Sequence, residues 1–196
     1  MLNEETFWSG SPHDNDSHRS LRRLEEVRKL IFEGREDKAI RIVNEDFLTG
    51  KNGMLFLPAG SLSLNFGDTT ATSAYRRSLD LRTAVNTTEY VQNGIRHVRT
   101  AFASLADKVI VLRLESSKPQ DFSLEYGAVL EHDVRADGNE IVATVKGIAH
   151  EGVPAGLNAE MRIRVAGDGD VEACGDFLKI CNATKSTILI SGATNF

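Results

Sequence analysis

Two periodicities divide the chain. Between residues 18 and 48, apolar residues recur every three or four positions, which is typical of amphipathic helices. From about residue 55, apolar and polar residues alternate in short runs separated by turn residues, which is typical of strands. The pattern therefore predicts a single domain over 1–196, with a helical hairpin at about 18–48 and strands over about 55–196.

Two apolar stripes define the predicted hairpin. The first is formed by Leu21, Leu24, Val27, Leu30 and Ile31, and the second by Ala39, Ile40, Val43 and Phe47. We expect Ser17 or Ser20 to cap the first helix and Gly34 to end it. The second helix is expected to end at Thr49-Gly50. Two short helices with a tight link form a helical hairpin.

The strand region carries clear turn signals. In "SLSLNFG", Leu62, Leu64 and Phe66 alternate with polar residues, so one face is apolar. Asn93-Gly94 predicts a tight hairpin, because both residues tolerate positive φ. Further turns are expected at 137–139 and 167–170. Strands separated by turns, without intervening helices, predict an antiparallel β-sandwich.

The overall composition limits the classes of partner that the chain is expected to bind. The 196 residues are 41% hydrophobic and 26% charged, with a net charge of −5. This mild acidity argues against a nucleic-acid partner, which requires a basic surface. No run is long and apolar enough to span a bilayer, and the start lacks the layout of a signal peptide. We therefore expect no membrane partner and a cytoplasmic location for the chain as given, although full-length relatives can be exported.

Metal and thiol chemistry have little support. Cys174 and Cys181 lack zinc-ligand spacing and are interpreted as ordinary thiols. Asp14 and Asp16 stand between two histidines, but Arg19 occupies the position where a calcium loop requires glycine. Turn and capping roles are simpler. "GDGDVE" at 167–172 is likewise a hairpin turn before it is a calcium loop, and His97 is interpreted as a satisfied polar residue within a strand. No metal or cofactor is predicted.

The opening run "NEETFWSGSPHDNDS" leaves two interpretations. Glycoside hydrolysis needs an acid and a base that flank the scissile bond. Carboxylates are available at Glu4, Glu5, Asp14 and Asp16, and Trp8 could stack on a sugar face. Acidic residues before a helix are also common because they favour its N-terminal dipole. The residues alone do not choose between a site and a structural turn.

Five motifs in series carry a family resemblance. They are "LNEETFWSGSPHDND", "LEEVRKLIFEGREDKAIRIVNEDFL", "PAGSLSLNFG", "YRRSLDLRTA" and "RTAFASLADKVIVLRLESS". The series resembles the N-terminal domain of glycoside hydrolase family 95, the inverting α-L-fucosidases, which also includes some α-L-galactosidases. The similarity covers about residues 2–125 well, and the remainder fits as sandwich strands.

The resemblance implies a β-super-sandwich with an inserted helical hairpin. In the family, this domain precedes an (α/α)6 barrel that holds the catalytic acid, base and assisting Asn residues. We therefore expect a non-catalytic N-terminal domain that supports such a barrel, in cis or in trans, in hydrolysis of terminal α-L-fucosides. No catalytic residue is assigned here, and the chain is predicted to be inactive alone. Asn3, Glu4, Trp8 and Asp14 are the predicted pocket-rim or interdomain residues.

Two other functions remain open. Family members usually carry a glycine-rich segment before the "NE…WSG" run, and Met1 stands directly before it here. A missing strand would leave an open edge for pairing with a second copy. A self-associating structural protein, joined through that edge or through the barrel-facing surface, is one alternative. A stand-alone carbohydrate-binding module using Phe7, Trp8 and nearby carboxylates is the other.

Overall fold

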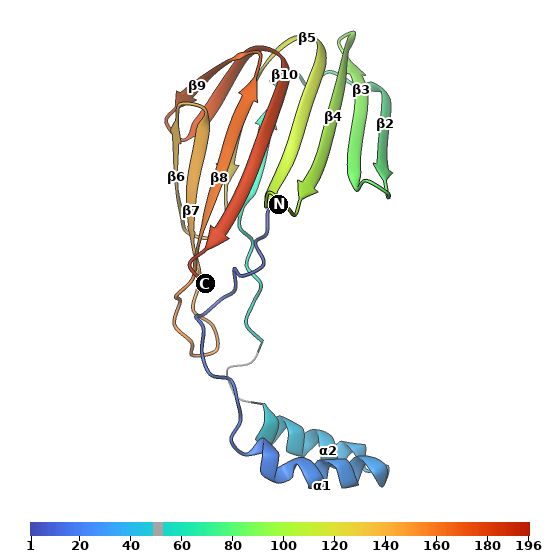
Figure 1. The fold of residues 1–196 in the computed structure, drawn as a ribbon, viewed down its shortest axis with the longest axis vertical. Coiled ribbons are helices and arrows are strands. Elements are labelled where there is room, and N and C mark those ends of the chain that lie inside the picture. Colours follow the sequence, from blue (N-terminus) through green and yellow to red (C-terminus); the bar gives the residue numbers. More distant parts are fainter. Residues whose placement is uncertain (49–52) are drawn as a thin grey trace. The chain divides into compact units, whose positions relative to one another are not determined.

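The structure is a computed structural model that describes residues 1–48 and 53–196 (Figure 1). The described chain divides into two compact units. The sheet unit comprises Met1–Phe7, Pro58–Lys146 and Asn158–Asn195. The helical unit comprises Trp8–Leu57, Gly147–Leu157 and Phe196. The prediction of a single domain stays a prediction.

The helices lie within the predicted range. They are α1 (Ser20–Phe32), α2 (Glu36–Ile42) and a π-helical turn, η1 (Val43–Phe47). Gly34 follows α1 with φ +71° and donates its N–H to the Ile31 carbonyl, so the predicted stop is confirmed. The predicted stop at Thr49-Gly50 lies outside the described residues.

The predicted serine caps are wrong. Arg19 occupies the N-cap of α1, and no side chain caps it. The Ser17 hydroxyl instead donates to the Asp46 carbonyl, and the Ser20 hydroxyl donates to the Ser17 carbonyl. Neither hydroxyl accepts a hydrogen bond from the first N–H groups of α1, and the Ser17 contact ties the start of α1 to the end of the hairpin.

All strand pairs are antiparallel, as the alternation predicts. The strands are β1 (Ser61–Asn65), β2 (Ser73–Asp80), β3 (Val85–Gln92), β4 (Ile95–Ser104), β5 (Val109–Gly127), β6 (His132–Asp137), β7 (Glu140–Lys146), β8 (Asn158–Gly167), β9 (Asp170–Cys174) and β10 (Phe177–Thr194). Asn93 and Gly94 both have positive φ and join β3 to β4, so that predicted hairpin is confirmed.

Two long strands build both layers. The larger layer runs in the order β2-β3-β4-β5-β10-β8-β7-β6. The other halves of β5 and β10 pair with β1 and β9, respectively, and with each other. Register shifts in β10 between Ile180 and Lys185 mark where it changes partners. This arrangement confirms the predicted mainly β sandwich, and the sheet remains open at β2 and β6 (Figure 1).

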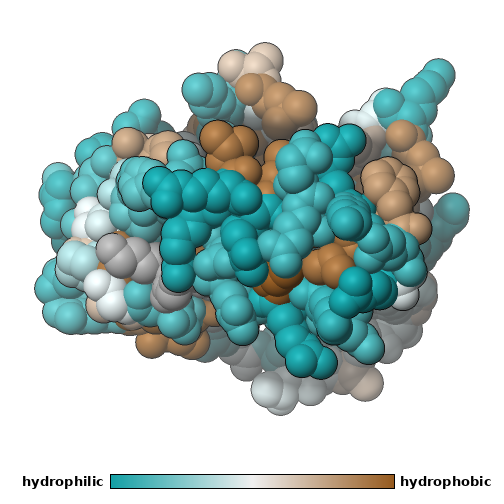
Figure 2. All heavy atoms as spheres, turned by 90° about the horizontal axis from the view of Figure 1, so that it is seen from below, coloured by the Kyte–Doolittle hydropathy of each residue, from teal (hydrophilic) through white to brown (hydrophobic). Residues whose placement is uncertain are grey.

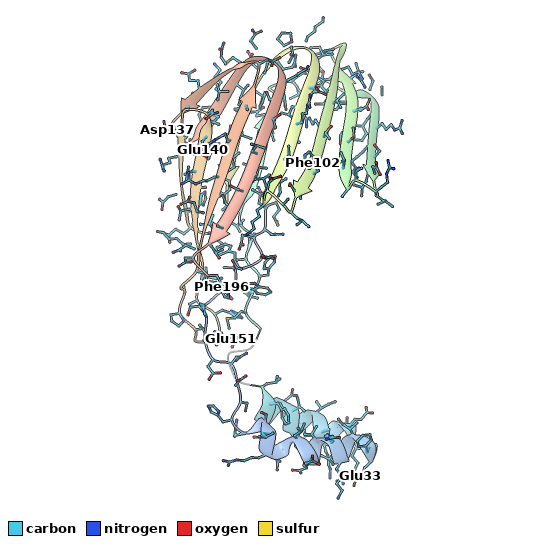
Figure 3. All side chains as sticks on the ribbon, in the orientation of Figure 1. Glu33, Phe102, Asp137, Glu140, Glu151 and Phe196 are labelled. Atoms are coloured by element: carbon cyan, nitrogen blue, oxygen red, sulfur yellow. The ribbon has the colours of Figure 1, made fainter. Side chains whose placement is uncertain are left out.

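The core lies between these layers. On β8, Ala159, Met161, Ile163 and Val165 are buried and alternate with exposed residues. Leu124 on β5 and Leu178 on β10 are also fully buried. Strand β2 is exposed along its whole length, so burial is concentrated on the β7, β8 and β10 side of the sheet. Figure 3 labels Phe102 on β4, which is exposed, and Glu140 on β7, which is half-buried, so neither belongs to this core.

Candidate functional site

The first two predicted site residues, Asn3 and Glu4, belong to the sheet unit. Leu2 pairs with Gly60 through its N–H, and the Ala59 N–H donates to the Leu2 carbonyl at 2.9 Å. Asn3 is exposed. The Glu4 carboxylate accepts hydrogen bonds from the Thr6 N–H at 2.8 Å and from the Thr6 hydroxyl at 2.7 Å. Glu4 therefore closes a local turn, as expected for a structural carboxylate.

Trp8 belongs to an exposed aromatic pair in the helical unit. The Ser9 N–H donates to the Leu55 carbonyl at 2.8 Å, and the Ser9 hydroxyl accepts from the Leu55 N–H at 2.8 Å. This pairing places the Trp8 ring 4.9 Å from the Phe56 ring at an interplanar angle of 52°. Trp8 is 40% exposed and Phe56 is 45% exposed. The pair forms an accessible apolar surface with a rigid base.

Asp14 also serves a turn. Its carboxylate accepts the Asp16 N–H at 2.9 Å, and both residues are exposed. Within residues 1–48 and 53–196, no group of three or more His, Cys, Asp or Glu side chains is placed to hold a metal ion. Asp14 therefore has the backbone role that its position before α1 suggests.

The four predicted site residues are distributed over both units. Asn3 and Glu4 belong to the sheet unit, whereas Trp8 and Asp14 belong to the helical unit. That they share one pocket rim stays a prediction.

A second carboxylate lies in the turn predicted at 167–170 and stabilises that turn. Asp168, in the turn between β8 and β9, accepts the N–H groups of Thr184 at 2.9 Å and Lys185 at 2.8 Å, as well as the Thr184 hydroxyl. The Thr184 hydroxyl, followed by the Lys185 N–H, holds the pKa of Asp168 below its usual value. This carboxylate fastens the β8–β9 turn to the bend of β10.

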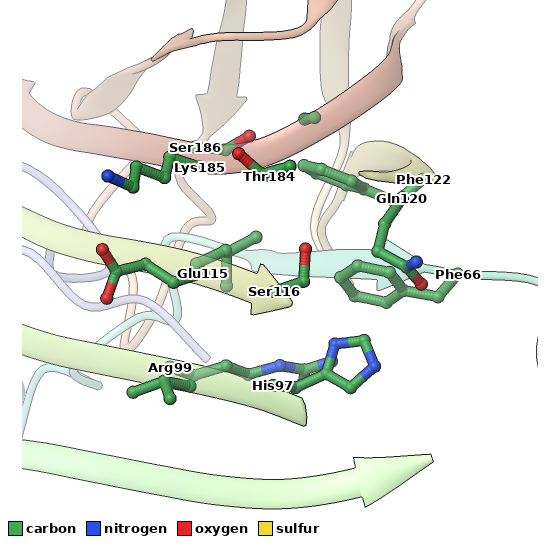
Figure 4. Close-up of a pocket in the computed structure, with 13 residues that line it drawn as sticks. Phe66, His97, Arg99, Glu115, Ser116, Gln120, Phe122, Thr184, Lys185 and Ser186 are labelled. Carbon is green, nitrogen blue, oxygen red and sulfur yellow. The ribbon is translucent and has the colours of Figure 1, made fainter. Parts of the chain in front are cut away.

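Sequence reasoning did not find a small cavity on the inner face of the sheet unit. Figure 4 shows that it is lined by side chains of several strands, among them Phe66, His97, Arg99, Ser116, Phe122 and Ser186. The Arg99 guanidinium lies 4.8 Å from the Phe66 ring centre and 5.2 Å from that of Tyr90, and it donates to the Tyr90 hydroxyl at 2.6 Å. These cation–π contacts fix the arginine in place.

Burial beside this arginine lowers the pKa of His97. It is buried, and its ring stacks on Tyr90 with 4.7 Å between ring centres. Burial first, and then the nearby Arg99 charge, lower the pKa of His97, while Asp68 opposes them. The signal that could have located this cluster is register, because the Asn93-Gly94 turn sets His97 opposite Tyr90.

The cavity is too small for a sugar. Its volume is about 20 Å³, whereas small-molecule sites usually span about 300–1,000 Å³. A space of this size suits one water molecule. The Ser186 hydroxyl lines it, is 2% exposed, and has no hydrogen-bond partner among the described residues. The arrangement therefore has a structural character rather than that of a substrate site.

No helix in the described part of the chain is long and apolar enough to cross a membrane.

Comparison with known proteins assigns the family. A family model described as "Glycosyl hydrolase family 65, N-terminal domain" matches residues 1–196. The chain is similar to "Alpha-L-fucosidase 2" of Arabidopsis thaliana, with 28% identity over 221 residues that cover 100% of this chain and 26% of the relative. It is similar to "Probable alpha-fucosidase A" of Aspergillus oryzae, with 23% identity over 203 residues that cover 100% of this chain and 28% of the relative.

These matches confirm the resemblance to the N-terminal domain of a fucosidase-like glycoside hydrolase. The chain spans about a quarter of the length of the curated relatives it matches. The matching family model is numbered 65, and the finer assignment to family 95 that the motifs suggest stays a prediction. The chain therefore belongs to the family described as the N-terminal domain of glycosyl hydrolase family 65.

Proposed function

We propose that this chain is the non-catalytic N-terminal part of an α-L-fucosidase-like glycoside hydrolase and that it supports the catalytic barrel in hydrolysis of terminal α-L-fucosides. The observation that carries the proposal is the family match over residues 1–196, combined with relatives named as fucosidases that are about four times longer. Because the chain covers about a quarter of such a protein, the remainder is large enough to hold a separate catalytic part.

The chemistry of the described residues supports a non-catalytic role. A glycosidase needs two carboxylates on opposite sides of a sugar-sized cleft. Glu4, Asp14 and Asp168 instead accept hydrogen bonds from nearby backbone and hydroxyl groups. The cavity beside Ser186 has room for one water and not for a sugar ring.

An activity measurement on the chain alone tests the proposal. We expect no hydrolysis of an aryl α-L-fucoside above that of buffer. The matched controls are Glu4→Gln and Asp14→Asn, which remove the two predicted rim carboxylates. Turnover by the unaltered chain that either substitution abolishes would contradict the non-catalytic role.

The assignment to family 95 is a finer proposal supported by the five motifs. Because that family resemblance implies inversion, the longer polypeptide should release β-L-fucose from an α-L-fucoside. Nuclear magnetic resonance of the first product formed distinguishes the two anomers. Release of α-L-fucose would contradict this assignment.

We also propose that Asn3, Glu4, Trp8 and Asp14 face the catalytic barrel at its pocket rim. Trp8 supports this role because its ring is 40% exposed although its backbone is firmly paired. In the longer polypeptide, Trp8→Ala should raise KM or lower the melting temperature. Tyr75→Ala, at an exposed aromatic on β2, is the control. Equal kinetics and melting of both variants would remove Trp8 from the rim.

A second candidate function is carbohydrate binding by the chain alone. The exposed Trp8–Phe56 pair favours it, because sugar faces stack on accessible aromatic rings. Trp8 is the single tryptophan, so titration with fucosylated oligosaccharides should quench its fluorescence, and Phe56→Ala should weaken the effect. An unchanged spectrum at millimolar sugar would exclude this function.

A further inference from the structure

The helical hairpin has two faces of opposite chemistry. One face is charged, and its lining includes Glu26, Lys29, Glu33, Arg35, Lys38, Arg41 and Glu45. The other is a groove of about 440 Å³ between α1 and α2, lined by Val27, Ile31, Ala39, Ile40 and Val43 together with Glu36 and Asn44. An apolar groove that stays exposed to water does not stabilise a helical hairpin.

Helical spacing explains the division. Val27 and Ile31 are four residues apart on α1, so they lie on one side of that helix. Ala39 and Val43 have the same spacing across α2 and the start of η1. Both helices therefore direct an apolar stripe into the same groove, while the charged residues follow the opposite side.

Large apolar side chains of this hairpin remain exposed. Ile31 is 51% exposed and Ile40 is 56% exposed, although both line the groove. Phe32, at the end of α1, is 85% exposed. Figure 3 marks this end of the hairpin with Glu33, and Figure 2 shows hydrophobic side chains exposed among hydrophilic ones on the face seen from below. An exposed apolar group of this kind marks an interaction surface.

The hairpin's own core is small. Its buried members are Val27, Leu30 and Ala39, against which Ile42, Val43 and Phe47 pack partly. Short helices are marginal in water without such packing. Covering the groove would therefore both remove apolar surface from water and stabilise the two helices.

We propose that this groove is the surface by which the chain docks on the catalytic part of the longer polypeptide. The inference rests on the proposed function and adds to it the surface involved and its occupant, an apolar ridge on an outer helix of the barrel. The lining includes one charged residue, Glu36, so a ridge of aliphatic side chains fits better than a charged one. Helix ridges seat in such grooves at interaxial distances of about 8–10 Å.

The length of the relatives argues for this occupant. The chain covers 26% and 28% of the two relatives, so roughly three quarters of such a protein lies beyond the match. A partner on the same polypeptide also has a high effective concentration, which favours docking over association with separate molecules.

Binding between separately produced parts tests the proposal. The catalytic part encoded with this chain is titrated with three forms of residues 1–196. Ile31→Lys combined with Ile40→Lys places two positive charges in the groove. Glu33→Gln combined with Glu45→Gln raises the net charge by the same amount on the charged face. We expect the groove pair to weaken binding at least 30-fold and the control pair to change it less than twofold.

Circular dichroism accompanies the titration, because a variant must keep its helices to be informative. Ile31 and Ile40 are both more than half exposed, and lysine is a good helix former, so the helical signal should persist. If the lysine pair loses helix, Ile31→Ala combined with Ile40→Ala replaces it, with an expected loss of at least fivefold in affinity.

The outcomes separate the two proposals. Equal binding by the unaltered chain and the folded groove variants overturns the groove while leaving the proposed function intact. A coding sequence without a catalytic part, or an unaltered chain that does not bind it, overturns the proposed function and the occupant together. A dimer of residues 1–196 in light scattering that the groove substitutions dissociate assigns the groove to a second copy, which overturns docking on the barrel.

Discussion

The sheet unit and the helical hairpin bury their apolar residues to different depths. In the sheet unit, Leu124, Ile141, Ile163 and Leu178 are completely enclosed. In the hairpin, the buried side chains are Val27, Leu30 and Ala39, each with a few per cent of its surface exposed. Two layers that pack face to face enclose a core between them. Two packed helices bury only the residues along their shared seam.

The difference shows that the sheet unit covers its own apolar residues, whereas the hairpin leaves part of its apolar surface exposed. Both regions show regular apolar patterns in sequence, so the pattern alone does not reveal how much surface the fold covers. Strands β5 and β10 contribute to both layers, and each layer covers the other. The two helices of the hairpin bury one shared seam and leave an apolar groove open beside it. The substitutions below are ordered from the largest expected effect to the smallest.

Ile163→Ala should cause the largest loss. Ile163 is fully buried on β8, and truncating a buried isoleucine costs about 2–5 kcal/mol through lost burial and the cavity left behind. Urea unfolding followed by the β-sheet signal in circular dichroism measures the change. Arg164→Ala, at the neighbouring exposed position, should alter the free energy of unfolding by less than about 1 kcal/mol. Equal losses for both variants would mean that the β8 core is not packed as described.

Leu30→Ala should affect the hairpin alone. Removing this buried leucine costs about 1.5–3 kcal/mol of apolar burial, which is a large share of so small a core. The helical signal in circular dichroism should fall, while the unfolding midpoint of the sheet stays unchanged. Leu21→Ala, at a largely exposed position, is the control. A parallel shift of the sheet midpoint would show that the two regions unfold together.

The raised pKa of Tyr126 predicts that the sheet unit loses stability at alkaline pH. Its hydroxyl donates to the Ala59 carbonyl, and burial raises the pKa of Tyr126 to about 12 from 10.0. The unfolded chain therefore releases the proton first, so stability is intact below pH 10 and declines as the pH rises toward about 12.

The measurement compares the unaltered chain with Tyr126→Phe across this pH range. The variant loses the hydrogen bond, at a cost of about 0.5–1.5 kcal/mol near neutral pH. The gap between the two proteins should narrow as the pH rises from 10 to about 12. A constant gap would show that Tyr126 titrates normally.

Ser186→Ala should have the smallest effect. The Ser186 hydroxyl is buried and has no partner among the described residues. Removing such a hydroxyl also removes its desolvation cost, so the free energy of unfolding should change by less than about 1 kcal/mol or increase. A loss above about 2 kcal/mol would indicate that an ordered water in the cavity satisfies Ser186.

The alternating pattern predicted the strands well, because every second residue of β8 is apolar and faces the core. It also located the Asn93-Gly94 hairpin and the Gly34 stop, where local backbone geometry decides the outcome. The two-layer path of β5 and β10 could not be predicted in the same way. Their change of partners at the bend depends on pairing between residues far apart in the chain.

Contacts between residues far apart in the sequence explain what was missed at the candidate site. The serine caps failed because Ser17 meets the Asp46 carbonyl, a contact made by tertiary structure. The cluster of Phe66, Arg99 and Phe122 draws on three separate segments, so no short motif announces it. Turn roles for Asp14 and Asp168 were predictable because their acceptors and donors are close in sequence or set by a hairpin.

The position of β10 in the sheet has a consequence for synthesis. It is the last strand along the chain, but it lies between β5 and β8 and joins the two halves of the larger layer. A growing chain on the ribosome can form the β2–β5 meander and the β6–β8 meander early, but it cannot unite them until β10 emerges. During that interval the inner edges of both meanders lack their partner strand, and an unpaired strand edge is a template for pairing with another chain.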